Sequence, residues 1–139
     1  MPPAYQFARV YQAQSILTTT PGNLVLMLYD GAIRFLNQAI DADTETDERQ
    51  RIQKMHASLV KAQNILVELR ANLDFKAGGD YALNLDRLYD YYLRRILQAN
   101  LQKSTEPIGE VIGLIGQLRS GWAEMLLKQG ANEPMCGVA

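Results

Sequence analysis

Apolar residues recur every three or four positions along most of the chain after residue 20, which is the spacing of one face of an α-helix. Residues 85–101 show this pattern most clearly, because a second apolar line runs beside the first. The first line consists of Leu85, Leu88, Tyr89, Tyr92, Ile96 and Ala99, and the second of Leu93, Leu97 and Leu101. This helix is therefore expected to present more apolar surface than one neighbouring helix covers.

Two helices are predicted before this one. Thr20 and Pro21 provide a hydroxyl N-cap and a proline at the first helical position, so a helix is expected from there to about Ile40. A second helix is expected to begin near Asp47 and to end near Asp74. Its apolar seam consists of Ile52, Met55, Leu59, Ala62, Leu66, Leu69 and Leu73.

Glycine and proline set the remaining boundaries. Gly78 and Gly79 predict a turn, and Asp80 predicts the N-cap of a third helix from about Tyr81 to Lys103. A fourth helix begins at Ser104–Pro107 and runs to about Gln129. Its seam consists of Ile108, Val111, Ile115, Leu118, Trp122 and Met125. Four helices joined by short loops predict an all-α, antiparallel up-down four-helix bundle.

The two ends of the chain lack this periodicity. Residues 1–20 mix aromatic and aliphatic residues with Gln, Ser and Thr, which predicts an irregular N-terminal arm. Residues 130–139 are small and polar and are expected to form a flexible tail. We therefore expect a single domain over residues 1–139, in which residues 21–129 form the bundle.

Composition narrows the function classes. Among 139 residues, 14 basic and 15 acidic side chains give a formal net charge of -1, which does not indicate nucleic-acid binding. No apolar run approaches the roughly 18 residues of a membrane span, and the N-terminus lacks the pattern of a signal peptide, so a cytoplasmic protein without membrane insertion is expected. The single cysteine, Cys136, has no partner for an internal disulfide.

Candidate catalytic and metal-ligating residues are sparse. His56 is the only histidine, has no His or Cys partner at ligand spacing, and is interpreted as a core-edge residue. Asp86 and Asp90 share a helix face, but the Glu-x-x-His pairs of di-metal bundles are absent from the sequence. The sequence therefore predicts no enzyme, no metal and no cofactor.

The apolar surplus favours a binding surface. In the fourth helix Gly109, Gly113, Gly116 and Ser120 line one side and would let another helix approach closely. Packing within the bundle is the alternative for this strip and for the extra apolar lines. If the surplus is exposed, the arm would cover a groove that a partner helix takes over.

Two stretches carry a resemblance to a known family: YQAQSILTTTPGNLVLMLYDGAIRFL, from Tyr11 to Leu36, and LYDYYLRRILQANL, from Leu88 to Leu101. With Trp122 in the last helix, they resemble the flagellar secretion chaperone family, FliS, over nearly the whole chain. The resemblance implies a cytoplasmic bundle, without enzymatic activity, that holds the C-terminal segment of newly made flagellin. Flagellin bound in this way cannot polymerise prematurely.

The resemblance also implies a route to secretion. The flagellin segment would wrap around a chaperone monomer, one client per chaperone, as an extended chain with short helices, and would displace the arm. The complex would dock on the cytoplasmic domain of the flagellar type III export gate, to which Tyr11 contributes. The family often has a bulky apolar residue three positions before this tyrosine, where this chain has Ala8, with Phe7 one place earlier. The arm and gate-docking residues are Phe7, Tyr11, Ile16 and Leu17.

The apolar surplus of the helices and the family resemblance together suggest roles for particular bundle residues. The client-binding groove is assigned to Leu26, Tyr29, Ile33, Leu93, Leu97, Asn100, Leu101, Gly113 and Gly116. Asp30, Arg94 and Arg95 are assigned structural polar roles as struts between helices, with contacts to the client backbone as the alternative. The alternative function from another class is a structural or regulatory bundle that packs against a second copy of itself.

Overall fold

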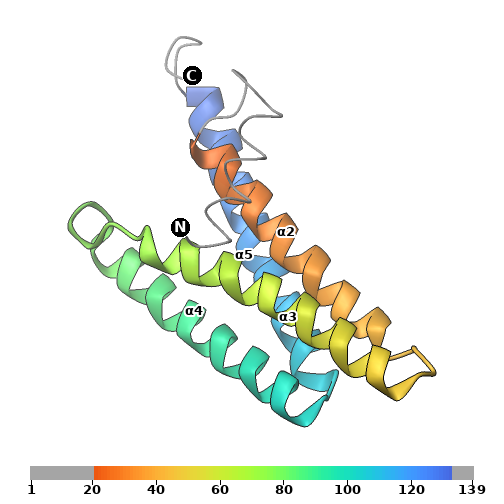
Figure 1. Cartoon of the computed structure of the whole chain (residues 1–139). Helices are drawn as coiled ribbons and strands as arrows, with labels where there is room; N and C mark the ends of the chain where they lie inside the picture. The colour runs from red at the N-terminus through yellow and green to blue at the C-terminus, as the bar shows by residue number, and fades with distance from the viewer. Residues whose placement is uncertain (1–20, 133–139) are drawn as a thin grey trace.

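The computed structural model describes residues 21–132, and the side chains of residues 21–129. These residues form α2 (Pro21–Ala42), α3 (Glu48–Ala71), α4 (Phe75–Gln102) and α5 (Glu106–Asn132). Each helix runs antiparallel to the one before it, α2 packs against α3 and α5, and α4 packs against the same two helices (Figure 1). The predicted all-α, up-down four-helix bundle is confirmed.

The start of α3 lies where the sequence placed it. Asp47 has an extended backbone conformation and its Oδ1 accepts a hydrogen bond of 3.0 Å from the backbone N–H of Gln50. This contact satisfies one of the backbone donors that a helix leaves unpaired at its N-terminus. The Asp47 cap thus fixes the boundary between the short acidic loop and α3.

The turn between α3 and α4 comes earlier than predicted. Asp74 caps α4 by accepting 3.0 Å hydrogen bonds from the backbone N–H groups of Lys76 and Ala77. Gly79, with φ 52° and ψ -129°, kinks α4 without ending it. The predicted start at Tyr81 with Asp80 as its cap is therefore too late, because Asp74 already caps α4. The predicted turn at Gly78 and Gly79 is instead a kink at Gly79, where glycine tolerates the positive φ. At the other end of the chain, α5 continues past Gln129 to Asn132.

The core follows the predicted seams with two exceptions. Leu88, expected on the core face of α4, is 38% exposed, and Ile52, expected in the seam of α3, is 41% exposed. Both positions lie at the edge of their helix faces, where no neighbouring helix covers them fully. The fully buried large side chains are Tyr29, Leu36, Met55, Leu59, Ile65, Leu66, Tyr89, Tyr92, Ile96, Ile108, Val111 and Ile115.

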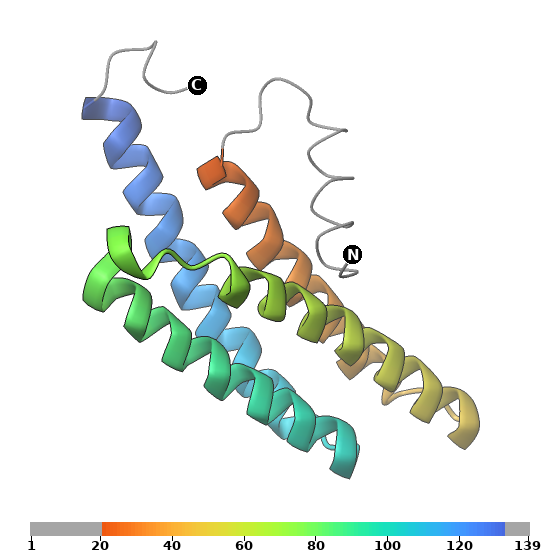
Figure 2. The ribbon, with the colours of Figure 1, turned by 60° about the vertical axis from the view of Figure 1, so that its left-hand side comes forward.

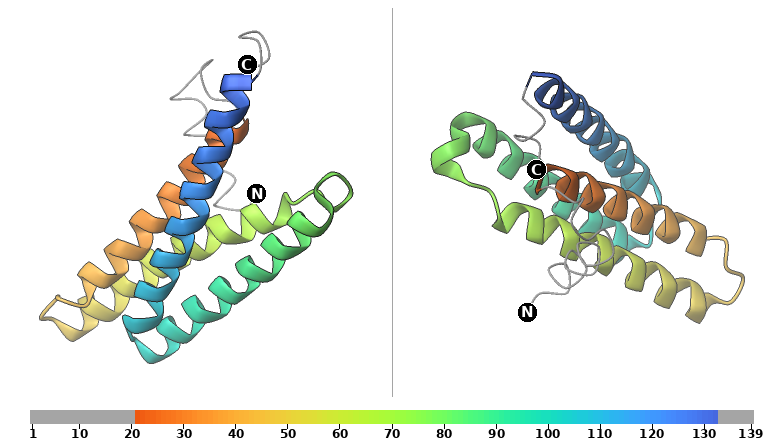
Figure 3. Two further views of the ribbon diagram at one scale, coloured as in Figure 1. Left: turned by 180° about the vertical axis from the view of Figure 1, so that it is seen from behind. Right: turned by 90° about the horizontal axis from the view of Figure 1, so that it is seen from above.

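The four helices do not stay equally close along their length. They lie together at the end that contains the α2–α3 and α4–α5 turns. Toward the opposite end, α2 with α5 diverges from α3 with α4 (Figures 1 and 3). Figure 2 shows the same separation between the end of α5 and the kinked start of α4. The bundle is therefore open at one end, and apolar side chains that would meet in a closed bundle line a cavity there.

Candidate binding site

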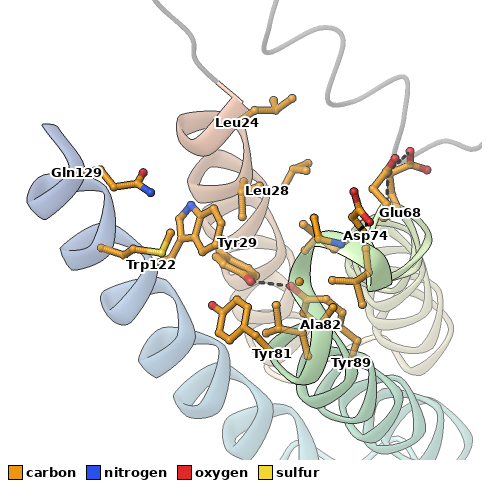
Figure 4. A pocket seen from close by; sticks show the side chains of 18 residues that line it. Leu24, Leu28, Tyr29, Glu68, Asp74, Tyr81, Ala82, Tyr89, Trp122 and Gln129 are labelled. Carbon is orange, nitrogen blue, oxygen red and sulfur yellow. Dashed lines mark hydrogen bonds between the residues drawn. The ribbon is translucent and has the colours of Figure 1, made fainter. Parts of the chain in front are cut away.

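The open end of the bundle contains a cavity of about 790 Å³ to which all four helices contribute (Figure 4). Most of its lining is apolar. The lining residues are Leu24, Val25, Leu28, Tyr29, Glu68, Leu69, Asn72, Leu73, Asp74, Ala77, Gly78, Tyr81, Ala82, Leu85, Tyr89, Trp122, Met125 and Gln129. Its volume lies in the range of about 300–1,000 Å³ that is typical of ligand pockets.

Two tyrosines form a polar point in this apolar lining. The hydroxyl oxygens of Tyr29 on α2 and Tyr89 on α4 lie 2.6 Å apart, and both residues are buried. Burial raises the pKa of both hydroxyls above their usual value of 10.0. The pair is therefore neutral near pH 7, and each hydroxyl has its hydrogen-bond partner in the other.

The wall formed by α2 and α5 is held by close contacts. Trp122 Nε1 donates a 2.9 Å hydrogen bond to the backbone oxygen of Gly22, which joins α5 to the first turn of α2. A Cβ atom at Gly22 would lie 2.5 Å from Cδ2 of Leu126. A side chain at this position would therefore have to displace the end of the Leu126 side chain. The Trp122 ring lies at the cavity.

Charged groups in the cavity lining are acidic. Glu68 on α3 is 8% exposed, and its Oε1 accepts a 2.9 Å hydrogen bond from Asn72 Nδ2. Asp74 is the N-cap of α4. Figure 4 shows both carboxylates on the same side of the cavity, across from Trp122 and Gln129.

Of the residues assigned to the groove from the sequence, Tyr29 lines this cavity. Leu26 and Ile33 lie outside the cavity lining. Leu26 precedes Asp30 by four residues and Ile33 follows it by three, so all three lie on one side of α2. Asp30 Oδ1 lies 2.6 Å from Arg119 Nε of α5, so this side of α2 faces α5. Leu26 and Ile33 are half-buried at this α2–α5 edge.

The four assigned residues of α4 gather at the α3–α4 edge. Asn100 is hydrogen-bonded through Nδ2 to Nδ1 of His56 on α3, at 2.8 Å, and Lys103 Nζ donates to its Oδ1. Leu93 is partly buried, whereas Leu97 is 53% and Leu101 76% exposed. His56, expected at the core edge, is exposed on this seam.

The glycines of α5 form a fourth location. A Cβ atom at Gly113 or Gly116 would meet no atom of the described residues within 4 Å. The alternative considered from the sequence, tight packing of this strip within the bundle, does not occur among residues 21–132. The structure therefore separates the predicted groove into the cavity, the α2–α5 edge, the α3–α4 edge and the open side of α5.

The three polar residues differ in what they join. Asp30 pairs across α2 and α5, as described above. Arg95 Nε lies 2.6 Å from Glu110 Oε1 and joins α4 to α5. Arg94 pairs with Asp90 of its own helix at 3.1 Å and so does not span two helices itself. Hydrogen bonds from Tyr91 and Arg95 lower the pKa of the Glu110 carboxyl.

The cavity itself was missed from the sequence. Leu69, Trp122 and Met125 belong to the predicted seams of the second and fourth helices, and Leu24 and Leu28 lie within the predicted first helix. Their periodicity indicates burial but does not distinguish a closed core from an open cavity. The kink at Gly79, read as a turn, was the local signal that α4 bends at this end.

The expectations for both termini fall outside the described part of the chain. These concern the arm residues Phe7, Tyr11, Ile16 and Leu17, and residues 133–139 with Cys136. Residues 130–132, expected in the tail, continue α5.

Within residues 21–132, no group of three or more His, Cys, Asp or Glu residues could hold a metal ion. None of the helices in the same residues combines the length and apolar character required to cross a membrane. The fold and the site define an all-α helical-bundle protein with an open, mainly apolar cavity among its described residues.

Comparison with known proteins identifies the family. Residues 3–129 match the family model described as "Flagellar protein FliS". The flagellar secretion chaperone FliS of Bacillus subtilis is 36% identical over 116 residues, which cover 84% of this chain and 83% of that protein. The Salmonella typhimurium FliS is 35% identical over 128 residues, 91% of this chain and 92% of that protein. Flagellar secretion chaperone FliSB of Pseudomonas aeruginosa is 34% identical over 117 residues, which cover 84% of this chain and 90% of that protein. This chain belongs to the FliS family of flagellar secretion chaperones, which is a chaperone family and not an enzyme family.

Proposed function

We propose that this protein is a cytoplasmic chaperone that binds the disordered C-terminal segment of flagellin. Binding covers the apolar stripe through which flagellin ends pair during polymerisation, so the bound subunit stays unassembled. The chaperone then helps to deliver flagellin to the flagellar type III export gate. Family membership supports the client class, and the geometry of the bundle supports the mode of binding.

The observation that carries this proposal is the open, mainly apolar cavity between the two helix pairs. A closed bundle would bury Leu24, Trp122 and Met125, whereas here these side chains are only partly covered. Removing such surface from water favours association by about 25 cal/mol per Å² of apolar area. A segment with an apolar stripe is the partner that gains most from this surface.

The dispersed surfaces favour an extended client. The cavity and the α3–α4 edge, with exposed Leu97 and Leu101, lie on different parts of the bundle. A compact ligand would reach one of them, whereas an extended chain with short helices reaches several. Ordering such a chain costs about 2–5 kcal/mol, which distributed apolar contacts offset while leaving a complex that export can reverse.

The arm completes the proposed cycle. In the absence of flagellin, Ile16, Leu17 and their neighbours cover part of the client surface, and the client displaces them. Tyr11 then contributes to docking of the complex on the cytoplasmic domain of the export gate. Because the client displaces the arm before Tyr11 contacts the gate, only a loaded chaperone would be recognised by the gate.

Sedimentation velocity with purified flagellin tests the proposal. We expect the protein alone to sediment as a monomer and to form a 1:1 complex with full-length flagellin. Flagellin that lacks its C-terminal segment is the matched control and should not bind. A tight dimer that ignores flagellin would support the self-associating bundle instead, and equal binding of truncated flagellin would contradict the assignment of the C-terminal segment.

A further inference from the structure

The cavity at the open end carries a charge that its own lining does not balance. Resting on the proposed function, we infer that the segment bound there bears one cationic side chain beside its apolar residues. The cation lies against the Glu68 carboxylate. The cavity would thus select a client segment by charge as well as by apolar surface.

Glu68 is the buried charged residue of the cavity lining. Its side chain lies in the cavity lining, the residue is 8% exposed, and its hydrogen-bond partner within residues 21–129 is the neutral amide of Asn72. None of the ion pairs among these residues includes Glu68. A buried carboxylate without a cation is costly, and a partner that supplies one recovers part of that cost.

The other charged residue of the cavity lining is also acidic. Asp74 lies on the same side of the cavity, and the lining contains no Lys, Arg or His within the described residues (Figure 4). Trp122 and the uncharged Gln129 lie on the opposite side (Figure 4). A ligand with apolar groups toward α5 and a cation toward α3 therefore matches both sides.

The size of the cavity fits a peptide segment. About 790 Å³ accommodates several large apolar side chains together with one long cationic side chain. An arginine matches the carboxylate best, because its guanidinium donates two hydrogen bonds in the geometry of a carboxylate. The inferred ligand is thus a short amphipathic segment with a single arginine at the edge of its apolar stripe.

A pair of synthetic peptides tests this chemistry. Both are amphipathic helices with leucine at positions i, i+3, i+4 and i+7, and they differ by arginine or its neutral near-isostere citrulline. Trp122 is the only tryptophan of the chain and lines the cavity, so its fluorescence reports occupancy in the full-length protein. We expect both peptides to change this fluorescence, and the arginine peptide to bind about tenfold more tightly.

The variant Glu68→Gln removes the charge but retains an oxygen that can accept from Asn72. In this variant the tenfold preference for arginine should fall to about onefold, with the citrulline peptide unaffected. Asp43→Asn is the matched control, because Asp43 is an exposed acid in the α2–α3 loop, away from the cavity lining. It should keep the full preference. Far-UV circular dichroism checks that both variants remain helical.

The inference is overturned if neither peptide changes the Trp122 fluorescence, or if Glu68→Gln retains the preference for arginine. These results are independent of the sedimentation test. Flagellin that binds wild type and Glu68→Gln with equal affinity would leave the chaperone function intact and refute the charge selection. Peptide selection by Glu68 without any flagellin binding would instead refute flagellin as the client.

Discussion

Tyr29 and Tyr89 share a 2.6 Å hydrogen bond that joins α2 to α4 across the diagonal of the bundle. Both rings lie in the cavity lining, and both residues are almost fully buried. The principal helix contacts run around the perimeter, between α2 and α3, α3 and α4, α4 and α5, and α5 and α2. The tyrosine pair is therefore a direct polar link between helices that otherwise meet mainly through their shared neighbours.

Removing one hydroxyl of this pair should destabilise the fold. Tyr29→Phe leaves the Tyr89 hydroxyl buried without its partner, which costs about 1–3 kcal/mol. Urea denaturation should show this as a lower free energy of unfolding. The double variant Tyr29→Phe, Tyr89→Phe removes both polar groups and should lose less than the sum of the two single variants; additive losses would show that the hydroxyls do not depend on each other.

Alkaline pH should weaken the bundle through its buried tyrosines. Burial raises the pKa of Tyr92 from 10.0 to about 12, and the pKa values of Tyr29 and Tyr89 are also raised. Because the folded state holds these protons more tightly than the unfolded state, their contribution is fully present below pH 10 and is lost as the pH rises toward 12. Urea midpoints measured across this range should fall, and Tyr92→Phe should make the decline shallower. An identical decline in that variant would contradict the role of Tyr92.

The kink in α4 depends on glycine at position 79. Its φ of 52° and ψ of -129° lie in a region that side chains disfavour, although a Cβ atom there would meet nothing within 4 Å among the described residues. Gly79→Ala should therefore lower the free energy of unfolding by about 1–3 kcal/mol through backbone strain alone.

The matched control for this variant is Gly113→Ala. Gly113 lies inside α5 without a positive φ, and an added Cβ there would also meet open space among residues 21–132. This substitution should stabilise the protein by about 0.5–1 kcal/mol, because alanine loses less conformational freedom than glycine in a helix. Equal effects of the two variants in thermal or urea unfolding would rule out the backbone explanation.

The exposed leucines of α4 should matter for the client and little for the fold. Leu97 and Leu101 are 53% and 76% exposed, so replacing both by serine removes little buried surface. If flagellin covers them, its affinity should fall at least about tenfold, as expected for the loss of two apolar contacts. Isothermal titration measures the affinity, and urea unfolding checks that stability is retained.

Leu127→Ser provides the comparison for the leucine variant. Leu127 on α5 is 75% exposed and lies outside both the cavity and the predicted groove. Flagellin affinity should be unchanged in this variant. A similar loss in both proteins would mean that general surface hydrophobicity, and not the α3–α4 edge, determines binding.

The candidate site was predicted only in part, for reasons that particular residues make clear. The extra leucine line of α4 was recognised because Leu97 and Leu101 repeat at helical spacing beside a complete core face, and both side chains are exposed. The cavity was not recognised, because Leu28 and Trp122 have the same periodicity whether a bundle is closed or open. The charge of Glu68 was also overlooked, since a glutamate beside a seam usually faces solvent.

The sequence by itself determined the four helices, their antiparallel order and most of the core, because helical periodicity and end caps such as Asp47 are local properties of the chain. Tertiary structure decided where the helices separate, and hence that Tyr29, Glu68 and Trp122, from three different helices, line one cavity. It also placed the turn at Asp74 and the kink at Gly79. These features depend on the angles at which distant segments pack, and a one-dimensional pattern does not contain those angles.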